Sequence, residues 1–474
     1  MSAPWTLVID ERLLHELMDH LFGRDSGEHG AVIAAGIVKT PRGTRLLARE
    51  LFLAEDGIDY VGGRRGYRML TAEFVSEKIR SCRDEKLVYL AVHNHGGRGY
   101  VAFSDDDMRS HERGYPALVD ISGGPVGALV FAENAVAGDI WTPDRTRRPL
   151  EEMIVVGRNI QRWHPAPPPR PPKADPTFDR QARWLGDRGQ DLLSRLKVGV
   201  IGAGGAGLPL ITLLARLGVG EITVIDPDRI DPTNLPRLDV RRVDAMTFLR
   251  RVPRTDRLAN RLSTRKVNLA RRAVRRASRS IKFVGIPLNV IEPEAALALV
   301  DADFIFLAAD SHQARMVFNA VLHQFLIPGI QIGTKIPVEN GSGVVGDILT
   351  NIRLVLPYSG CFRCNRLISP SKLQDESLAG RERERNRYLE EVPAPSVITF
   401  NTFSAAQAAN DFLMMFGNLL QGEEPNGYLR GRPRERKMEP VTPLPNKADC
   451  RDCGTTSRSR RGRGQGAELP LPQR

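Results

Sequence analysis

Apolar residues change their spacing along the chain, and this spacing predicts where helices and strands lie. In the front part, helices are predicted over Glu11–Leu21, where leucines recur on one side, and over Thr71–Arg83. The strand-like apolar runs are Ala31–Val38, Thr44–Leu53, Lys86–His93, Ala117–Ile121 and Val126–Ala132. This order of elements predicts a small α+β domain of about 150 residues.

The second half of the chain alternates strands with helices. Lys197–Gly202 is typical of a buried strand, Leu208–Leu217 of a helix and Glu221–Asp226 of a second strand. A further strand is predicted over Phe304–Ala309, after an intervening helix. Because strands that alternate with helices form parallel sheets, we expect a doubly wound, mostly parallel, Rossmann-like sheet here. The predicted fold class is α/β, with the α+β domain in front.

A proline-rich segment separates the two halves. Pro165–Pro176 suits neither helix nor sheet and is predicted to run as an extended spacer. At 474 residues the chain is too long for one compact core. The predicted domains are residues 1–160 and 177–455, joined by a linker at 161–176. The basic tail, residues 456–474, has little to bury and is predicted to be disordered.

Composition limits the classes of protein to consider. Hydrophobic residues make up 41% of the chain, and no apolar run is long enough to cross a membrane. The first residues lack the layout of a signal peptide, so we expect a cytoplasmic protein. The net charge of +12 is concentrated in Arg241–Lys282 and Arg458–Arg463. No recognition motif accompanies these arginines, which favours solvated helix faces over nucleic-acid binding.

Two histidines, a serine and an aspartate follow one another after a predicted strand. His93 and His95 lie two apart, so in a strand both project from one face. Asp107 lies one turn after Ser104 on a predicted helix, so these two also share a face. Zinc accepts imidazole and carboxylate ligands, and a catalytic zinc leaves a fourth position to water. The spacing predicts a zinc hydrolase centre, although Ser104 is also suited to cap the helix.

This pattern resembles the JAMM (MPN-type) metallopeptidases, whose motif is a glutamate, His-x-His and Ser-x-x-Asp. The resemblance covers roughly residues 1–150 and implies a catalytic Zn²⁺. The implied ligands are His93, His95 and Asp107. It also implies that Glu28 is the general base and that Ser104 stabilises the oxyanion. Members of the family cleave peptide or isopeptide bonds after the C-terminus of ubiquitin-like proteins.

Three positions complicate the comparison with that family. Glu50 is an alternative to Glu28, which precedes the apolar run from Gly30 to Val38. Asn94 stands where Ser or Thr is common, and Gly96 replaces a usual proline. None of these differences changes a predicted ligand.

A glycine-rich loop connects a strand to a helix in the second half. The glycines are Gly202, Gly204, Gly205 and Gly207. Glycines allow the backbone to approach a phosphate, and the N-terminus of the following helix offers free N–H groups to the anion. Asp226 ends the next strand, where an acidic residue binds ribose hydroxyls. Taken alone, these features also fit an NAD-dependent dehydrogenase.

The surrounding residues resemble the ThiF/MoeB and ubiquitin-activating enzyme family. The matching positions are Arg180 and Gln181, Asp226 and Asp228, Asn234 and Arg237, Lys266, and Asp310 with Arg315 and Asn319. The resemblance spans roughly residues 177–455. It implies adenylation of the C-terminal glycine of a small ubiquitin-like protein by ATP and Mg²⁺. The stretch between Arg237 and Lys266 is longer than in small family members, which leaves Arg265 as a competitor of Lys266.

The resemblance also implies a role for each matched residue. Asp226 would bind the ribose, and Asp310 would position Mg²⁺. The implied phosphate ligands are Asn234, Arg237 and Lys266. Arg180 would reach across a homodimer interface into the partner's site. Cationic side chains around the triphosphate offset its charge while a carboxylate attacks the α-phosphate.

Four of the five cysteines form two Cys-x-x-Cys pairs, which favour metal over disulfides in a chain without a secretion signal. These cysteines are Cys361, Cys364, Cys450 and Cys453. They predict a structural zinc knuckle, which the resembled family also carries. The fifth, Cys82, is predicted to be a buried helix thiol. The adenylating half would then lack a cysteine of its own for a thioester.

Together the two resemblances predict a bifunctional enzyme that acts on one ubiquitin-like protein. The peptidase would expose the C-terminal glycine or release conjugates. The second half would activate that terminus and pass it to a conjugating enzyme or a sulfur donor. One alternative is sulfur-carrier activation, with the peptidase trimming the carrier. The others are a scaffold with inactive sites and an NAD enzyme.

Overall fold

The computed structural model describes residues 3–23, 27–61, 69–339, 342–378, 395–421 and 427–472. It divides into two compact units. The first comprises Met1–Arg170, His323–Leu326 and Ala448–Glu468. The second comprises Pro171–Leu322, Ile327–Lys447 and Leu469–Arg474. The division after Arg170 falls inside the proline-rich segment.

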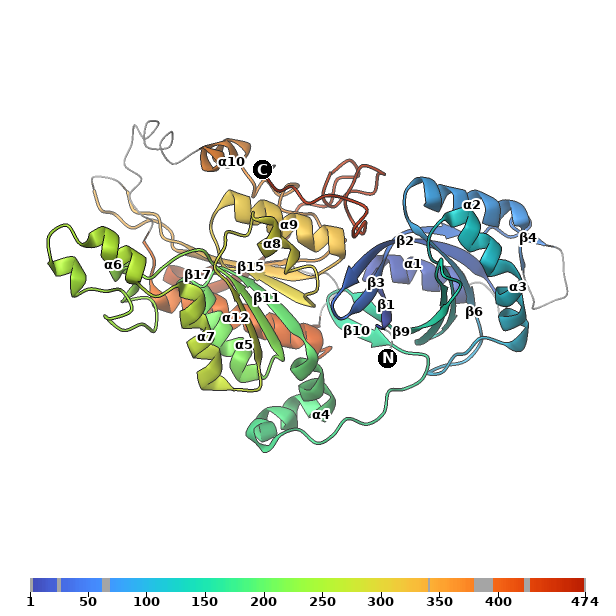
Figure 1. Cartoon of the computed structure of the whole chain (residues 1–474), viewed down its shortest axis with the longest axis horizontal. Helices are drawn as coiled ribbons and strands as arrows, with labels where there is room; N and C mark the ends of the chain where they lie inside the picture. Colours follow the sequence, from blue (N-terminus) through green and yellow to red (C-terminus); the bar gives the residue numbers. More distant parts are fainter. Residues whose placement is uncertain are drawn as a thin grey trace. The chain divides into compact units, whose positions relative to one another are not determined.

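An eight-stranded sheet forms the centre of the first unit, in the order β1-β3-β2-β6-β7-β8-β9-β10 (Figure 1). β1 pairs with both β3 and β9, so the sheet closes on itself. The strands are β1 (Trp5–Asp10), β2 (Gly30–Thr40), β3 (Gly43–Leu53), β6 (Val88–Asn94), β7 (Val126–Ala132), β8 (Ala135–Trp141), β9 (Arg147–Val156) and β10 (Ile160–Trp163). A separate two-stranded sheet pairs β4 (Tyr60–Val61) with β5 (Met69–Leu70).

Helices pack on both faces of this sheet. They are α1 (Glu11–Phe22), α2 (Ala72–Asp84) and α3 (Asp105–Ser122). α1 contributes leucines to a core that also contains Ile33, whereas α2 and α3 pack with Val32. Because neighbouring residues of β2 point to opposite faces, the sheet has one core on each side.

The strand predicted over Ala117–Ile121 is wrong, because these residues are the C-terminal part of α3. Tyr115 and Val119, one helical turn apart, are buried on the same face of that helix. The helix ends at Gly123, which adopts a left-handed conformation with φ of 67°. A short apolar run fits a strand and a buried helix segment equally well, and its length does not decide between them.

The C-terminal segment is an ordered part of the first unit, so the disorder predicted for the tail is wrong for residues 456–468. Two arginines of this segment, Arg461 and Arg463, bind acceptors in this unit. Arg461 Nη1 lies 3.2 Å from Asp10 Oδ2, and Arg463 Nη2 lies 2.5 Å from Glu85 Oε2. Gly464 forms a parallel bridge with Ile37 at the sheet. Arginine content alone therefore does not predict disorder here.

The second unit also has an eight-stranded sheet, in the order β13-β12-β11-β14-β15-β16-β17-β18. The strands are β11 (Lys197–Ile201), β12 (Glu221–Ile225), β13 (Lys282–Ile286), β14 (Phe304–Leu307), β15 (Gly329–Lys335), β16 (Leu349–Val355), β17 (Tyr428–Arg432) and β18 (Lys437–Val441). The strands from β13 to β15 are parallel, and the remaining three continue the sheet antiparallel. The predicted α/β class with a Rossmann-like sheet is confirmed.

Helices cover both faces of this second sheet (Figure 1). The α-helices are α4 (Asp179–Arg195), α5 (Gly207–Leu217), α6 (Asp256–Leu262), α7 (Lys266–Ala277), α8 (Pro293–Leu297), α9 (His312–Phe325), α10 (Pro370–Ser377) and α12 (Ile398–Phe416). The 3₁₀ turns are η1 (Pro176–Phe178), η2 (Pro232–Asn234), η3 (Leu249–Arg251) and η4 (Pro433–Glu435). α5, α7 and α12 lie on one face, and α8 and α9 lie on the other. Among the helices described, none is long and apolar enough to span a lipid bilayer.

Candidate metal centre and nucleotide-binding site

The three predicted zinc ligands of the first unit lie together. β6 carries His93, and His95 follows just beyond the end of that strand. Their Nε2 atoms are 3.2 Å apart. The carboxylate of Asp107, from the first turn of α3, lies 3.5 Å from His93 Nε2 and 3.4 Å from His95 Nε2. Two imidazoles and a carboxylate that face one point form a donor set that zinc accepts.

A backbone carbonyl orients one of these imidazoles. His95 Nδ1 lies 3.1 Å from the carbonyl oxygen of Ala102. Because a carbonyl only accepts, this contact favours the tautomer with the proton on Nδ1. The lone pair of Nε2 then faces the other two ligands, which is the usual arrangement of a metal-bound histidine.

Ser104 and Asp107 form a capping box at the start of α3. The Ser104 hydroxyl donates to Asp107 Oδ2 over 2.7 Å, and the backbone N–H of Ser104 donates to the same oxygen over 2.8 Å. Although burial opposes ionisation, hydrogen bonds from His93 and Ser104 hold the pKa of Asp107 well below its usual range. Ser104 therefore both caps α3 and fixes the carboxylate of Asp107, the candidate ligand.

Glu28 lies beside this group, with Oε1 4.0 Å from His95 Nε2. Burial raises the pKa of Glu28, although the imidazoles of His93 and His95 oppose this shift. The alternative, Glu50, pairs with Ala34 across the β2–β3 ladder. Within the described part of the chain, no ion pair joins Glu50 to the three ligands. The geometry thus favours Glu28 as the carboxylate of the centre.

Asn94, between the two histidines, holds the segment that carries Glu28. Its side chain is buried, and Oδ1 accepts a hydrogen bond from the N–H of His29 over 2.6 Å. Nδ2 donates to the carbonyl of Gly27 over 3.5 Å. Asn94 therefore binds the backbone on both sides of Glu28. The sequence marked this position only as a difference from the resembled family.

The glycine-rich loop of the second unit lies between β11 and α5. Gly202 has φ of 97°, and a Cβ there would lie 3.0 Å from the backbone of Ala308. A Cβ at Gly207 would lie 2.0 Å from the carbonyl oxygen of Gly202. Gly204 has open space instead, with nothing within 4 Å of a Cβ. The loop is thus tight at its ends and open at Gly204, as a phosphate-binding turn requires.

This loop lies where the strand order changes direction. β11 has β12 on one side and β14 on the other. In open α/β sheets, such a point leaves a crevice outside the carboxyl ends of the strands, where ligands bind. Asp310 follows β14 at this edge and is exposed.

Asp226 follows β12 and ties the glycine loop to the sheet. Its Oδ2 accepts from the N–H of Ala203 over 2.6 Å, and its Oδ1 accepts from the N–H of Asp228 over 2.9 Å. Burial raises the pKa of Asp226, and the charge of Lys266 opposes this shift. The carboxylate is therefore fixed beside the loop, at the position predicted for a ribose ligand.

Lys266, at the first turn of α7, faces the same edge of the sheet. Its Nζ lies 2.7 Å from Asp228 Oδ2. The competing Arg265 points to the carbonyl of Pro287, 3.4 Å away. The structure therefore brings Lys266, rather than Arg265, to the two aspartates.

The remaining predicted nucleotide ligands differ in their surroundings. Asn234 is buried in η2, and its Nδ2 donates to Asp231 Oδ2 over 3.1 Å. Arg237 follows shortly after, and in the residues described it has no ion pair. Arg180 is exposed on α4. No described contact brings Arg180 to the other candidates.

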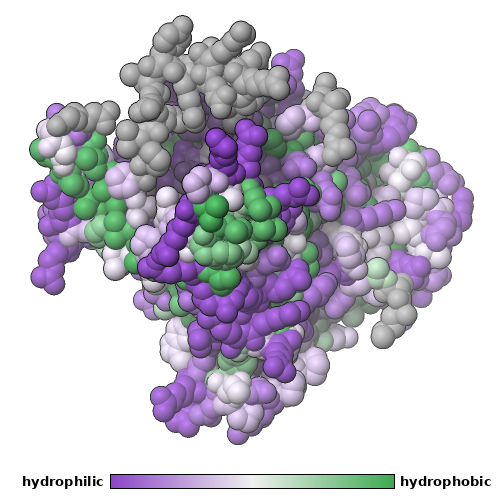
Figure 2. Space-filling view, turned by 60° about the vertical axis from the view of Figure 1, so that its left-hand side comes forward, coloured by the Kyte–Doolittle hydropathy of each residue, from purple (hydrophilic) through white to green (hydrophobic). Residues whose placement is uncertain are grey.

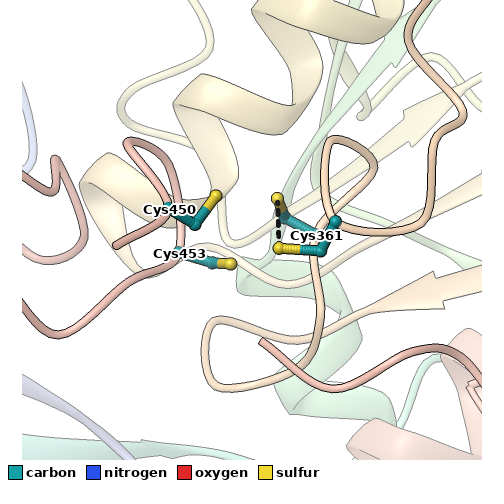
Figure 3. A group of neighbouring side chains, drawn as sticks. Cys361, Cys450 and Cys453 are labelled. Carbon is teal, nitrogen blue, oxygen red and sulfur yellow. Dashed lines mark hydrogen bonds between the residues drawn. The ribbon is translucent and has the colours of Figure 1, made fainter. Parts of the chain in front are cut away.

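The four cysteines form a second group of metal donors (Figure 3). Their ligand atoms lie within 4.8 Å of one another, and all four residues are buried. The sulfur atoms of Cys361 and Cys364 are 3.8 Å apart. Four thiolates at this spacing are the donor set of a structural zinc site.

Cys82 lies in the core of the first unit and is 1% exposed. Burial raises the pKa of this thiol to about 12. The prediction that Cys82 is a buried helix thiol is confirmed, and a neutral thiol away from solvent is a poor nucleophile.

Two contacts near the nucleotide loop had no signal in the sequence. A Cβ at Gly205 would lie 2.6 Å from Asn401 Nδ2, which comes from α12. Glu376 accepts hydrogen bonds from the N–H groups of His312 and Gln313 and so caps α9. Both residues lie far along the chain from the elements they contact, and no motif links them.

Comparison with protein families matches residues 178–411 to the ThiF family. The second part of the chain is therefore ThiF-like, in agreement with the resemblance found in the motifs. This match favours the ATP-dependent interpretation of the glycine loop over the nicotinamide one.

Curated relatives of the chain include an activating enzyme and adenylyltransferases. The SAMP-activating enzyme E1 of Haloferax volcanii is 26% identical over 192 residues, which are 40% of this chain and 61% of that protein. The adenylyltransferase and sulfurtransferase UBA4 of Meyerozyma guilliermondii is 28% identical over 175 residues, 36% of this chain and 34% of that protein. The sulfur carrier protein adenylyltransferase of Thermus thermophilus is 43% identical over 53 residues, 11% of this chain and 20% of that protein. The chain thus spans less than two thirds of each relative.

Among solved structures, E. coli MccB with ATP has a TM-score of 0.42 and 21% identity to this chain, covering 59% of this chain and 75% of MccB. MccB with MccA-N7isoASN has a TM-score of 0.44 and 21% identity, covering 59% and 76%.

Proposed function

We propose that the second unit adenylates the C-terminal carboxylate of a small ubiquitin-like or sulfur-carrier protein. One observation carries this proposal: the glycine loop, Asp226 and Lys266 lie together at the switch point of a ThiF-like sheet. The names of the relatives support the reaction type and the class of partner.

The reaction requires one substitution at phosphorus. A carboxylate oxygen of the terminal glycine attacks the α-phosphorus of ATP, the bond to the β-phosphate breaks, and pyrophosphate leaves. N–H groups of the glycine loop and the cations of Arg237 and Lys266 would offset the charge on the phosphates. Asp226 would hold the ribose, Asn234 would help to hold the phosphates and Asp310 would position Mg²⁺. Arg180 is proposed to act in the partner's site of a homodimer.

Replacing Lys266 with methionine is expected to lower ATP–pyrophosphate exchange by about 100-fold, because a cation beside the phosphates is lost. Arg265→Met is the matched control, since its guanidinium points to Pro287 instead. Exchange is measured with labelled pyrophosphate and a ubiquitin-like protein that ends in glycine. Equal losses in the two variants would contradict the assignment of Lys266.

For the first unit we propose zinc-dependent cleavage of a peptide or isopeptide bond that follows the terminal glycine of a ubiquitin-like protein. The proposal rests on the convergence of His93, His95 and Asp107 with Glu28 beside them. When bound, zinc would supply a Lewis acid that polarises water and the scissile carbonyl. Glu28 would take a proton from the attacking water and return it to the leaving nitrogen. Ser104 is proposed to aid the oxyanion, in addition to fixing Asp107.

Asn94→Ala is expected to lower kcat of this cleavage by about 10-fold, because Glu28 loses the hydrogen bonds that fix its segment. KM and the zinc content are expected to stay unchanged, since no proposed ligand is touched. Asn94→Asp retains an acceptor for the N–H of His29 and is expected to recover part of kcat. A parallel loss of zinc would show instead that Asn94 merely stabilises the metal centre.

We propose two alternative fates for the adenylate, which are conjugation to another protein and sulfur transfer. Cys82 is buried, so a thiol on another protein is the proposed acceptor. Incubation with ATP, the small protein and a conjugating enzyme distinguishes the alternatives. A thioester on that enzyme supports conjugation, whereas a sulfide-dependent gain in mass of the small protein supports sulfur transfer.

A further inference from the structure

The chain between Arg237 and Lys266 forms an insert, residues 239–263, that contains η3 and α6. This insert leaves an unusual amount of apolar surface exposed. Five of its large apolar side chains are between 47% and 55% exposed: Val243, Phe248, Val252, Leu258 and Leu262. Single exposed apolar residues are normal, but a group of five in one short segment marks a candidate interaction surface.

The insert and α7 line a cavity of about 890 Å³ that is open to solvent. Its charged lining consists of Arg241, Arg272, Arg275, Arg276 and Arg279 with Asp239 and Asp244, and Leu269 adds an apolar wall. This volume lies in the range of ordinary ligand sites.

Asp244 fastens the insert to α7. It is 4% exposed and accepts from Arg272 Nη2 over 2.7 Å and from the Thr264 hydroxyl over 2.9 Å. Although burial opposes ionisation, these hydrogen bonds lower the pKa of Asp244. The wall of the cavity is thus held by a buried carboxylate.

The other carboxylate of the cavity is also occupied, because Asp239 Oδ2 lies 2.8 Å from Arg276 Nη1. In the part of the chain that the structure describes, Arg275 and Arg279 pair with no carboxylate. Five guanidinium groups against two carboxylates leave an excess of three positive charges. Arginines near the C-terminal end of α7 interact favourably with the helix dipole, but that interaction contributes only about 0.3–1 kcal/mol. It also does not explain why the insert lies beside these arginines.

We propose that the insert and α7 form a docking site for an acidic protein segment. Its carboxylates would enter the arginine-lined cavity, and its apolar side chains would contact the exposed face of the insert. Figure 2 views the molecule from the side that carries α6 in Figure 1 and shows hydrophobic surface beside strongly hydrophilic surface. An apolar contact area with arginine at its edge is the usual composition of a protein interface. Binding of a nucleic-acid phosphate backbone would explain the arginines of the cavity but not the exposed apolar side chains of the insert. This inference goes beyond adenylation and does not depend on it.

The test uses the full chain and a fluorescein-labelled peptide with four Glu-Glu-Leu repeats, followed by fluorescence anisotropy. We expect saturable binding that weakens as salt is raised. Arg275→Glu with Arg279→Glu is expected to weaken binding at least about 10-fold. The matched control reverses two exposed arginines of α2, Arg80→Glu with Arg83→Glu, and changes the net charge equally.

The apolar part of the surface is tested separately. Phe248→Ser is expected to weaken the leucine-containing peptide about 3-fold and to leave a Glu-Glu-Ser peptide unchanged. Thermal unfolding of each variant shows whether it is folded. Absence of peptide binding, or equal loss in the two double variants, would overturn the proposal. Tighter binding of an oligodeoxythymidylate of matched charge, with the same sensitivity to Arg275 and Arg279, would assign the cavity to nucleic acid instead.

Discussion

Replacing His95 with alanine is expected to lower cleavage of a ubiquitin-like fusion protein by at least about 10⁴-fold, because the Lewis acid would be lost from the reaction. His95 Nε2 contacts both His93 and Asp107, so its removal leaves only two donors. Zinc content is expected to fall from two atoms per chain to one, since the four cysteines are unaffected. The zinc analysis provides a result that does not depend on finding the natural substrate.

His15→Ala is the control for this experiment, because His15 is an exposed histidine on α1. It is expected to leave zinc content and cleavage unchanged. ATP–pyrophosphate exchange is expected to continue in both variants. If His95→Ala kept two zinc atoms per chain, the proposed centre would be wrong whatever its activity.

Candidate site residues that lie close together in the chain are the ones that local structure brings together. His93, His95, Ser104 and Asp107 occupy one strand end and the next helix start, so local geometry brings them together. The same holds for Gly202, Gly207 and Asp226, which belong to one strand–helix–strand unit. Spacing is informative when a single supersecondary unit carries the site.

Contacts between distant segments could not be predicted in this way. The hydrogen bonds of Asn94 to both sides of Glu28 depend on the pairing of β2 with β6. The approach of Asn401 to Gly205 depends on the packing of α12 against the sheet. Neither contact leaves a periodic signal in the sequence, because each is decided by tertiary packing rather than by local propensity.

The order of residues 456–468 is the feature that departs most from what the composition of the chain predicts. Residues rich in Arg, Gly and Ser are typical of disorder when they have nothing to bury. Here Gly36 of β2 permits the close approach, because a Cβ at this position would lie 2.0 Å from the carbonyl oxygen of Gly462. The carboxylate partners of Arg461 and Arg463, which are Asp10 and Glu85, come from the opposite end of the sequence, so composition within the tail carries no information about them.

Replacing Arg461 with methionine is expected to lower the free energy of unfolding of the first unit by about 3–5 kcal/mol, because a buried carboxylate loses its partner. Asp10 is 1% exposed, and its Oδ1 accepts from the N–H of Leu13 at the start of α1. Its Oδ2 faces Arg461 Nη1 at 3.2 Å, and Arg461 Nη2 donates to the carbonyl of Arg49. The measurement is urea denaturation followed by tryptophan fluorescence, since three of the four tryptophans, Trp5, Trp141 and Trp163, lie in this unit.

The pH dependence separates this ion pair from a simple packing defect. Burial raises the pKa of Asp10 above its ordinary value, and the charge of Arg461 opposes that shift. Without Arg461, the folded-state pKa of Asp10 is expected to rise further, so folding binds a proton and the loss of stability shrinks as the pH falls towards that pKa.

Arg458→Met, at an exposed position of the same segment, is expected to change stability by less than about 0.5 kcal/mol. The double variant Asp10→Asn, Arg461→Met should recover part of the loss, because no uncompensated charge remains buried. A loss that does not depend on pH and is not recovered would mean that Arg461 acts through packing alone.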